Sequence, residues 1–285
     1  MIVSRATTAL VVDSTADLPD ELAADPNLTP VPLTVFFGEA SYLDWVELKP
    51  WEFYEKLATA PRLPTTSQPA PGVWLEIYTR LRERFSRVYS VHLSSQFSGT
   101  YETARMVAAE MDGVKVVDSQ LATGGFALLV DRMMARIDKG IPEEEFDVYI
   151  DYFLANKTFF FLPTTLDYLY KGGRIGRASH LVGTLLNVKP VLMIEDGVAD
   201  VYKKVRGTRQ ALEAMRNGLL QRTAPGSDVF PNLSHGYNLP LMEQLQELLE
   251  AIDDRRVHLR PASIVGSVIG TYIGPGALGL GFIQE

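Results

Sequence analysis

Short runs of β-branched residues alternate with helical patterns through the first half of the chain, and this alternation limits the possible folds more than any other feature. Strands are predicted at residues 8–12, 87–93 and 114–117. Helical spacing of apolar residues lies between and after them, at residues 72–85, 98–111 and 121–137. Strands and helices that alternate in this way form parallel sheets covered by helices. The first half is therefore predicted to be an α/β domain.

The second half has a pattern typical of antiparallel pairing. Strands at residues 188–194 and 198–205 are joined through Asp196-Gly197, a dipeptide typical of tight hairpins. Helices are predicted at residues 208–222 and 241–252, and the glycine-rich C-terminal segment resembles β-structure. A buried strand at residues 158–162 ends the first half, directly before Pro163. We predict a parallel-sheet α/β domain over residues 1–163 and a smaller α/β domain with antiparallel pairing over residues 164–285.

Composition and charge exclude several classes of protein. The 27 basic and 35 acidic residues give a net charge of −8, whereas a nucleic-acid-binding surface needs clustered positive charge. The chain has no cysteine, and its four histidines follow no metal-binding spacing. No apolar run approaches the ~20 residues that span a bilayer, and Asp13 interrupts the run that a secretory signal needs. We expect a soluble, cytoplasmic protein without metal, cofactor or nucleic acid; peripheral, transient contact with a membrane is compatible with these features.

A dense polar cluster follows the predicted strand at residues 87–93. It reads Ser94-Ser95-Gln96-Phe97-Ser98-Gly99-Thr100-Tyr101 and leads into a predicted helix. Ligands of open α/β sheets bind beyond the carboxyl ends of the strands, and a helix N-terminus offers free N–H groups to an anion. A single serine here would be a helix cap. Several hydroxyls beside a glycine favour a phosphate or carboxylate site.

Two smaller hydroxyl clusters lie in other predicted loops. Thr65, Thr66 and Ser67 form one of them, and Ser14 with Thr15 forms the other. Each alone is typical of turn chemistry. Together with the serine-rich loop they would make one crevice if their strands are neighbours.

Positive charge gathers at two places in this acidic chain. A glycine-rich turn at residues 171–177 contains Arg174, and Arg206 follows Lys203 and Lys204. Arginine beside glycine can approach an anion closely. The simpler alternative for the first place is a solvated loop in which Gly172 ends the preceding helix.

A glycine pattern near the C-terminus is not a dinucleotide site. Residues 274–279 match GxGxxG, but too few residues follow them to form the required βαβ unit. A glycine turn between two strands is the better interpretation.

The sequence contains binding residues without an evident catalytic set. It lacks a Walker-type phosphate loop and a GxSxG nucleophile elbow. We therefore predict a binding protein and not an enzyme. The alternative is a sugar-phosphate isomerase that holds phosphate in the serine-rich loop and uses Glu102 or His92 as its general base, although packing is the simpler role for His92.

Several segments, in order along nearly the whole chain, resemble the DegV family of bacterial fatty-acid-binding proteins. The matching segments are Val12-Asp13-Ser14-Thr15-Ala16-Asp17-Leu18-Pro19, Thr66-Ser67-Gln68-Pro69, Leu93-Ser94-Ser95, Ser98-Gly99-Thr100-Tyr101, Val117-Asp118-Ser119, Lys171-Gly172-Gly173-Arg174-Ile175, Lys189-Pro190-Val191-Leu192 and Gly274-Pro275-Gly276-Ala277. So many motifs in the order of the family are more specific than any one of them.

The resemblance implies one long-chain fatty acid, of the palmitate, stearate or oleate type, in an apolar tunnel. It implies that Thr66 and Ser95 hold the carboxylate, in a mouth formed by Thr66, Ser67, Ser94, Ser95, Ser98, Gly99 and Tyr272. Arg174 and Arg206 match basic residues of the family, which suit the anion mouth or partner docking. Apolar stretches at residues 126–130 and 159–162, with Phe126, Phe160 and Leu162 among them, are candidates for the tunnel wall, with ordinary core packing as the alternative.

The resemblance also implies a partner. Such proteins present the lipid to a separate ATP-dependent kinase, which phosphorylates the carboxylate to an acyl phosphate. Many members carry a histidine before the GPGA turn where this chain has Tyr272. Tyrosine can donate a hydrogen bond but cannot become a cation near neutral pH.

Overall fold

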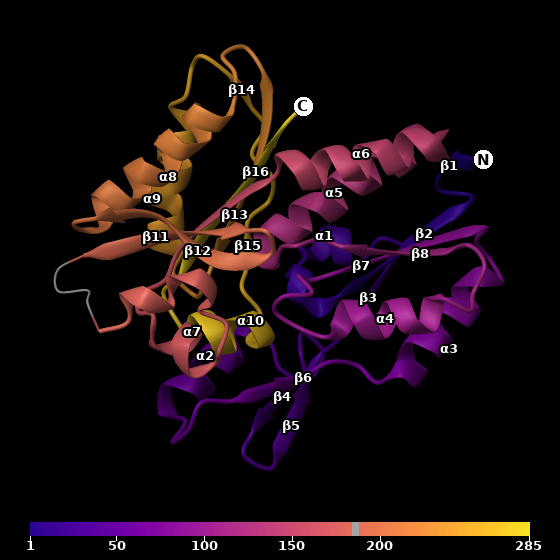
Figure 1. Ribbon diagram of the computed structural model, residues 1–285, viewed down its shortest axis with the longest axis horizontal. Coiled ribbons are helices and arrows are strands. Elements are labelled where there is room, and N and C mark those ends of the chain that lie inside the picture. Colours follow the sequence, from indigo (N-terminus) through magenta and orange to yellow (C-terminus); the bar gives the residue numbers. More distant parts are fainter. Residues whose placement is uncertain (184–187) are drawn as a thin grey trace.

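The computed structural model describes residues 1–183 and 188–285, which form two main sheets with helices around and between them (Figure 1). The first sheet is parallel, with its strands in the order β3–β2–β7–β8. Its strands are β2 (Thr8–Asp13), β3 (Leu28–Val31), β7 (Arg87–His92) and β8 (Val114–Asp118). Fully buried, β-branched strand interiors are typical of a sheet covered on both faces.

Helices cover both faces of this parallel sheet (Figure 1). On one face lie α3 (Pro71–Arg82) and α4 (Thr100–Ala108), whose Trp74, Tyr78 and Ala104 pack against strand residues such as Val88. On the other lie α5 (Thr123–Lys139) and α6 (Glu143–Asn156). Helix α5 also packs against strands of the second sheet, so it lies between the two sheets.

The second sheet has seven strands and mostly antiparallel pairing. Its order is β12–β11–β10–β16–β13–β14, with β15 also pairing with β13. The strands are β10 (Thr158–Leu162), β11 (Lys189–Glu195), β12 (Val198–Val205), β13 (Asp228–His235), β14 (Arg256–Val257), β15 (Ser263–Ile264) and β16 (Leu278–Gln284). The face turned away from α5 packs against α8 (Thr208–Arg222) and α9 (Leu239–Glu250).

A third, small sheet lies beside the other two (Figure 1). It has the order β5–β4–β6, and helices α2 and α10 pack close to it. Its strands and these helices are β4 (Thr34–Phe37), β5 (Ala40–Leu43), β6 (Thr65–Ser67), α2 (Pro50–Thr59) and α10 (Ser267–Ile273). The remaining elements are β1 (Ile2–Val3), η1 (Ser14–Ala16), α1 (Asp20–Ala23), β9 (Ile141–Pro142), α7 (Asp167–Lys171) and η2 (Gly176–Leu181).

The predicted α/β fold, with a parallel and an antiparallel part, is confirmed. The Asp196-Gly197 hairpin is confirmed as well, because both residues have the positive φ angles, 51° and 78°, that a tight primed turn requires. Among residues 1–183 and 188–285, no helix has the length and apolar character needed to cross a membrane.

Several predicted details differ from the structure. Strand β10 is an inner strand of the second sheet, so the change of sheet comes before Thr158; the domain division at residue 163 stays a prediction. The segment expected to be a loop at residues 65–69 contributes β6, because residues 65–67 pair with β4. The glycine turn at residues 274–279 connects α10 to β16, and so a helix, not a strand, precedes it.

Candidate functional site

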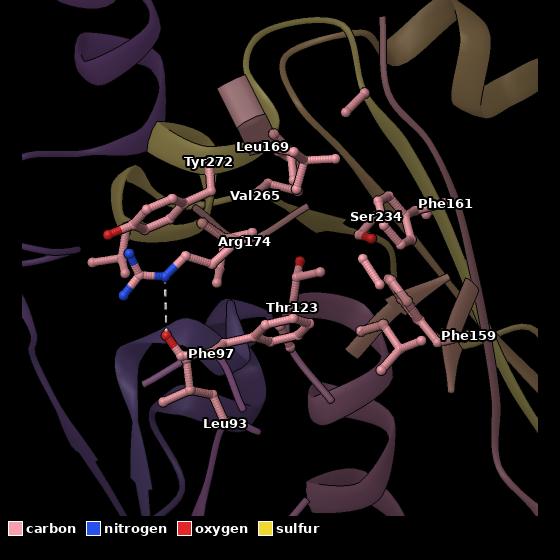
Figure 2. Close-up of a pocket in the computed structure, with 18 of the residues that line it drawn as sticks. Leu93, Phe97, Thr123, Phe159, Phe161, Leu169, Arg174, Ser234, Val265 and Tyr272 are labelled. Atoms are coloured by element: carbon pink, nitrogen blue, oxygen red, sulfur yellow. Dashed lines mark hydrogen bonds between the residues drawn. The ribbon is translucent and has the colours of Figure 1, made fainter. Parts of the chain in front are cut away.

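An internal cavity lies where the first sheet, the second sheet and α10 meet (Figure 2). Its wall contains the residue that follows β7, Leu93, and the start of α5, so it begins at the carboxyl edge of the parallel sheet, as expected for an open α/β sheet. The empty space measures about 800 Å³, part of it open to solvent.

Most of the cavity wall is apolar. Its apolar and glycine residues are Leu33, Leu93, Phe97, Ala122, Phe159, Phe161, Leu169, Ile194, Ala199, Val265, Val268, Ile269, Ile273, Ala277, Leu278 and Gly279. The polar residues of the described wall are Thr66, Ser98, Thr123, Arg174, Ser234 and Tyr272. A wall of this composition suits a long hydrocarbon ligand with one polar group.

Three of these polar residues lie together at one end of the cavity, where Tyr272 contacts both Thr66 and Arg174. Thr66 and Tyr272 share a hydrogen bond between their hydroxyls, with an O···O distance of 2.7 Å. The Arg174 guanidinium lies 4.7 Å from the centre of the Tyr272 ring and donates from Nε to the Phe97 carbonyl, 3.1 Å away (Figure 2). Arg174 therefore brings positive charge to the cavity, held in place by a cation–π contact and by backbone acceptors.

The glycines near Arg174 make this arrangement possible. A Cβ atom at Gly172 would lie 2.4 Å from the Tyr272 ring, so only glycine allows the ring to pack here. The Gly172 carbonyl also accepts from Arg174 Nη1 at 2.8 Å. Gly172 ends α7, as in the simpler alternative given for this turn, and in addition it shapes the polar end of the cavity.

The structure brings together only part of the predicted carboxylate site. Thr66, Ser98, Arg174 and Tyr272 line the cavity. Ser95 is half-buried and is not one of the residues that line the cavity. Gly99 is exposed, and it occupies the N-cap position of α4, while the Ser98 hydroxyl accepts from the Thr100 N–H.

Two further predicted site residues have other positions. Ser94 is fully buried and donates to the Gly197 carbonyl at 2.7 Å, so it holds the β11–β12 hairpin against the loop after β7. Ser67 is exposed on β6, and alternation along the strand turns it away from the side on which Thr66 meets Tyr272.

Arg206 does not join Arg174. It is exposed beside Lys203 and Lys204, at a separate surface hollow formed with α8. The basic residues therefore belong to two places, one in the cavity and one on the surface.

The pleat of β10 places two of the predicted tunnel residues outside the cavity. Phe160 and Leu162 point away from the cavity and pack in the core under α8 and α9. Their neighbours Phe159 and Phe161 line the cavity instead (Figure 2). Phe126 is fully buried in the core around α5 and lies outside the described wall.

The Asp13-Ser14-Thr15 motif is structural. The Asp13 carboxylate accepts hydrogen bonds from Leu93 N, Thr15 N and the Thr15 hydroxyl, and it pairs with His92 Nδ1 at 3.1 Å. His92 Nε2 in turn lies 2.8 Å from the Ser90 hydroxyl. This Asp–His–Ser chain resembles a hydrolase triad in its contacts, but all three side chains are completely buried and line no described pocket.

Neither candidate base of the isomerase alternative reaches the cavity. His92 is buried in the chain just described, and Glu102 is exposed and paired with Arg105. Within residues 1–183 and 188–285, no cluster of histidine and carboxylate side chains is suited to a metal ion.

Two buried carboxyl groups join α10 to the N-terminal half. Asp17 accepts from the Trp45 indole and from Gly266 N, and Asp44 accepts from Ser14 and from both Ser267 N and its hydroxyl. Burial, with the charge of Asp44 nearby, raises the pKa of Asp17 well above its usual value. Burial also raises the pKa of Asp44 to about 6.

These carboxyl groups predict how stability depends on pH. Because a raised pKa makes the folded state hold protons that the unfolded state releases, the stability that each protonated carboxyl contributes is present below about pH 4 and is lost as pH rises, in the case of Asp44 through its folded-state pKa of about 6. Asp17→Asn keeps the acceptor oxygen without the charge. We expect its unfolding free energy, relative to wild type, to rise between pH 4 and pH 7 in urea titrations. A difference that stays constant over this range, as we expect for the exposed Asp20→Asn, would contradict this account.

The family assignment follows from comparison with known proteins. A model of the DegV family matches residues 7–285. The chain belongs to the DegV family. This confirms the resemblance seen in the motifs.

Members of the DegV family with known structures share this fold. The structure of a fatty acid binding DegV family protein from Thermus thermophilus is 31% identical, covers 98% of this chain and 100% of its own, and has a TM-score of 0.93. The fatty acid binding DegV of Bacillus subtilis is 28% identical with a TM-score of 0.86, over 98% of this chain and 99% of its own. A curated fatty acid-binding protein from Thermotoga maritima is 33% identical over 95% of this chain and 96% of its own length.

Some cavity residues of this DegV protein escaped prediction. Thr123 and Ser234 line the wall but belong to none of the predicted loop motifs or tunnel segments. Ser234 carried a weak signal, since a polar residue inside an otherwise apolar strand is unusual unless it has a partner or a ligand.

Proposed function

We propose that this protein binds one long-chain fatty acid, of the palmitate, stearate or oleate type, in the cavity. The observation that carries the proposal is an apolar internal cavity with the contacting residues Thr66, Tyr272 and Arg174 at one end. Each buried methylene of an acyl chain contributes about 0.8 kcal/mol, so the apolar wall supplies affinity. The polar end supplies orientation. Relatives of known structure that bind fatty acids support this proposal, among them a stearic acid-binding protein from Eubacterium ventriosum that is 26% identical with a TM-score of 0.84.

The carboxylate lies at the end that contains Arg174. An unpaired carboxylate inside a protein is very costly, and Arg174 is the positively charged side chain of the described wall. The hydroxyls of Thr66, Ser98 and Tyr272 add donors around it. In a protein with a net charge of −8, a local cation of this kind is needed to attract an acid.

Serine variants test the position of the head group. Ser98→Ala removes a hydroxyl from the cavity, and we expect affinity for oleate to fall about tenfold or more, because a hydrogen bond to a charged group contributes about 1.5–3 kcal/mol. Ser95→Ala is the matched variant outside the described wall, with an expected change below about twofold. Calorimetric titration of delipidated protein with oleate measures both. A larger loss of oleate affinity in Ser95→Ala than in Ser98→Ala would place the carboxylate at the turn that contains Ser94 and Ser95.

We further propose that the protein does not itself turn over the lipid and presents it to a separate ATP-dependent kinase. A head group at the cavity end that is open to solvent would be reachable by such an enzyme. The exposed basic residues Lys203, Lys204 and Arg206 offer a surface for an acidic partner.

Reconstitution tests the kinase proposal. The oleate-loaded protein is mixed with ATP and the fatty acid kinase of the same organism, and acyl phosphate is trapped as a hydroxamate. Hydroxamate should form only when kinase, ATP and loaded protein are all present. Equal product from free oleate without this protein would contradict presentation, and turnover of sugar phosphates by the chain alone would contradict a binding role.

A further inference from the structure

One face of the second sheet carries three buried polar side chains with unsatisfied oxygens. Asn232 Oδ1, Ser234 Oγ and Ser263 Oγ each lack a hydrogen-bond partner in the described chain. Asn232 and Ser234 are two residues apart on β13, and Ser263 of β15 lies directly opposite Ser234 in the register. The three side chains are at most 2% exposed. Buried polar groups in native proteins nearly always have hydrogen-bond partners. We therefore expect a bound molecule to supply a partner on this face.

Ser234 is the member of this group that reaches the cavity. It lines the wall beside Phe161, and Figure 2 shows both at the end of the cavity away from Arg174. Two glycines leave room for its hydroxyl, because Cβ atoms at Gly279 and Gly124 would lie 2.4 Å and 3.1 Å from Ser234 Oγ. The hydroxyl is therefore accommodated, 1% exposed, and without an acceptor or donor from the described chain.

An unsubstituted acyl chain would leave this hydroxyl unsatisfied. A methylene cannot form a hydrogen bond, and a buried hydroxyl without one loses the bond it had to water. Thr123 is the next hydroxyl of the wall, and its Oγ1 likewise has no hydrogen-bond partner in the described chain.

We propose that the cavity recognises fatty acids that carry a second oxygen on the acyl chain, as a hydroxyl or keto group, with Ser234 as its partner. This inference rests on the proposed fatty-acid function and deepens it. Arg174 and its neighbours hold the carboxylate, and Ser234 selects the position of the chain substituent. A hydroxyl placed where the acyl chain contacts only apolar residues of the wall finds no hydrogen-bond partner there and is disfavoured.

Monohydroxystearates test the inference. Delipidated protein is titrated with stearate and with isomers that carry the hydroxyl at successive carbons. We expect one or two adjacent isomers to bind at least as tightly as stearate and about tenfold more tightly than the other isomers. Ser234→Ala should erase this preference and leave the affinity for stearate within about twofold. If the alanine variant folds poorly, Ser234→Cys replaces it. Its thiol forms only weak hydrogen bonds, so we expect this variant to lose the preference as well.

Ser263→Ala is the matched control, because Ser263 is equally buried and unpartnered in the described chain but does not line the cavity. It should leave the preference unchanged. Uniformly weaker binding of all isomers than of stearate, or a preference that survives in both Ser234 variants, would overturn the inference and leave the proposed function intact. Weaker binding of stearate itself in Ser234→Ala would place the carboxylate there and overturn it too. A wild-type protein that binds no isomer and no stearate would overturn the proposed function and the inference together.

Discussion

Ala199→Trp is expected to abolish fatty-acid binding while leaving the protein folded. Ala199 lies on β12, is 1% exposed and lines the cavity, so an indole at this position would occupy the space proposed for the acyl chain. Excluding four or more methylenes at about 0.8 kcal/mol each removes about 3 kcal/mol of binding energy. This corresponds to a loss of affinity of more than about 100-fold.

The measurement is a calorimetric titration of delipidated protein with oleate, alongside thermal unfolding. Filling a space inside the protein costs about 1–3 kcal/mol of stability, so a lower melting temperature with a cooperative transition is acceptable. Ala40→Trp, at an exposed position of β5, controls for the added indole and should bind as wild type does. Wild-type affinity in a folded Ala199→Trp protein would show that the acyl chain lies elsewhere.

Asp13→Ala is expected to destabilise the protein severely. The carboxylate joins the ends of β2 and β7 by accepting from Leu93 N, Thr15 N and the Thr15 hydroxyl, and by pairing with His92. Alanine would leave these groups buried without their acceptor. Breaking a buried pair of this kind lowers the free energy of unfolding by about 3–5 kcal/mol. The whole free energy of unfolding of a native protein is only about 5–15 kcal/mol.

Urea unfolding at neutral pH measures this effect. Glu102→Ala is the control, because Glu102 is an exposed carboxylate paired with Arg105, and such pairs contribute little. We expect its unfolding curve to overlie that of the wild type. Equal midpoints for Asp13→Ala and Glu102→Ala would contradict the structural role given to the Asp13–His92–Ser90 chain.

Local chemistry made the fold and one part of the site predictable. The βα alternation indicates the parallel sheet, because each strand and helix carries its own periodicity of apolar residues. Asp196-Gly197 predicts its hairpin, because the turn requires positive φ angles that these residues tolerate. The hydroxyl-rich segments likewise indicate Thr66 and Ser98, since the carboxyl edge of a parallel sheet is where ligands bind.

The rest of the site depends on contacts between distant segments. Tyr272 meets Thr66 across 206 residues of sequence, and no local pattern sets that pairing. The sequence does not show which face of β10 lines the cavity, because three consecutive phenylalanines on a strand buried on both faces show no alternation. Ser94 and Ser98 look equivalent in sequence, yet the hairpin of the second sheet engages one of them and leaves the other at the cavity.

The central claim is that the cavity holds one fatty acid, and mass spectrometry of the purified protein tests it most directly. The protein is weighed under native conditions, delipidated by organic extraction, and weighed again after addition of oleate. We expect one bound acid per chain, released by extraction and restored by oleate. A protein that carries no acid after purification and takes up none when oleate is added would contradict the claim.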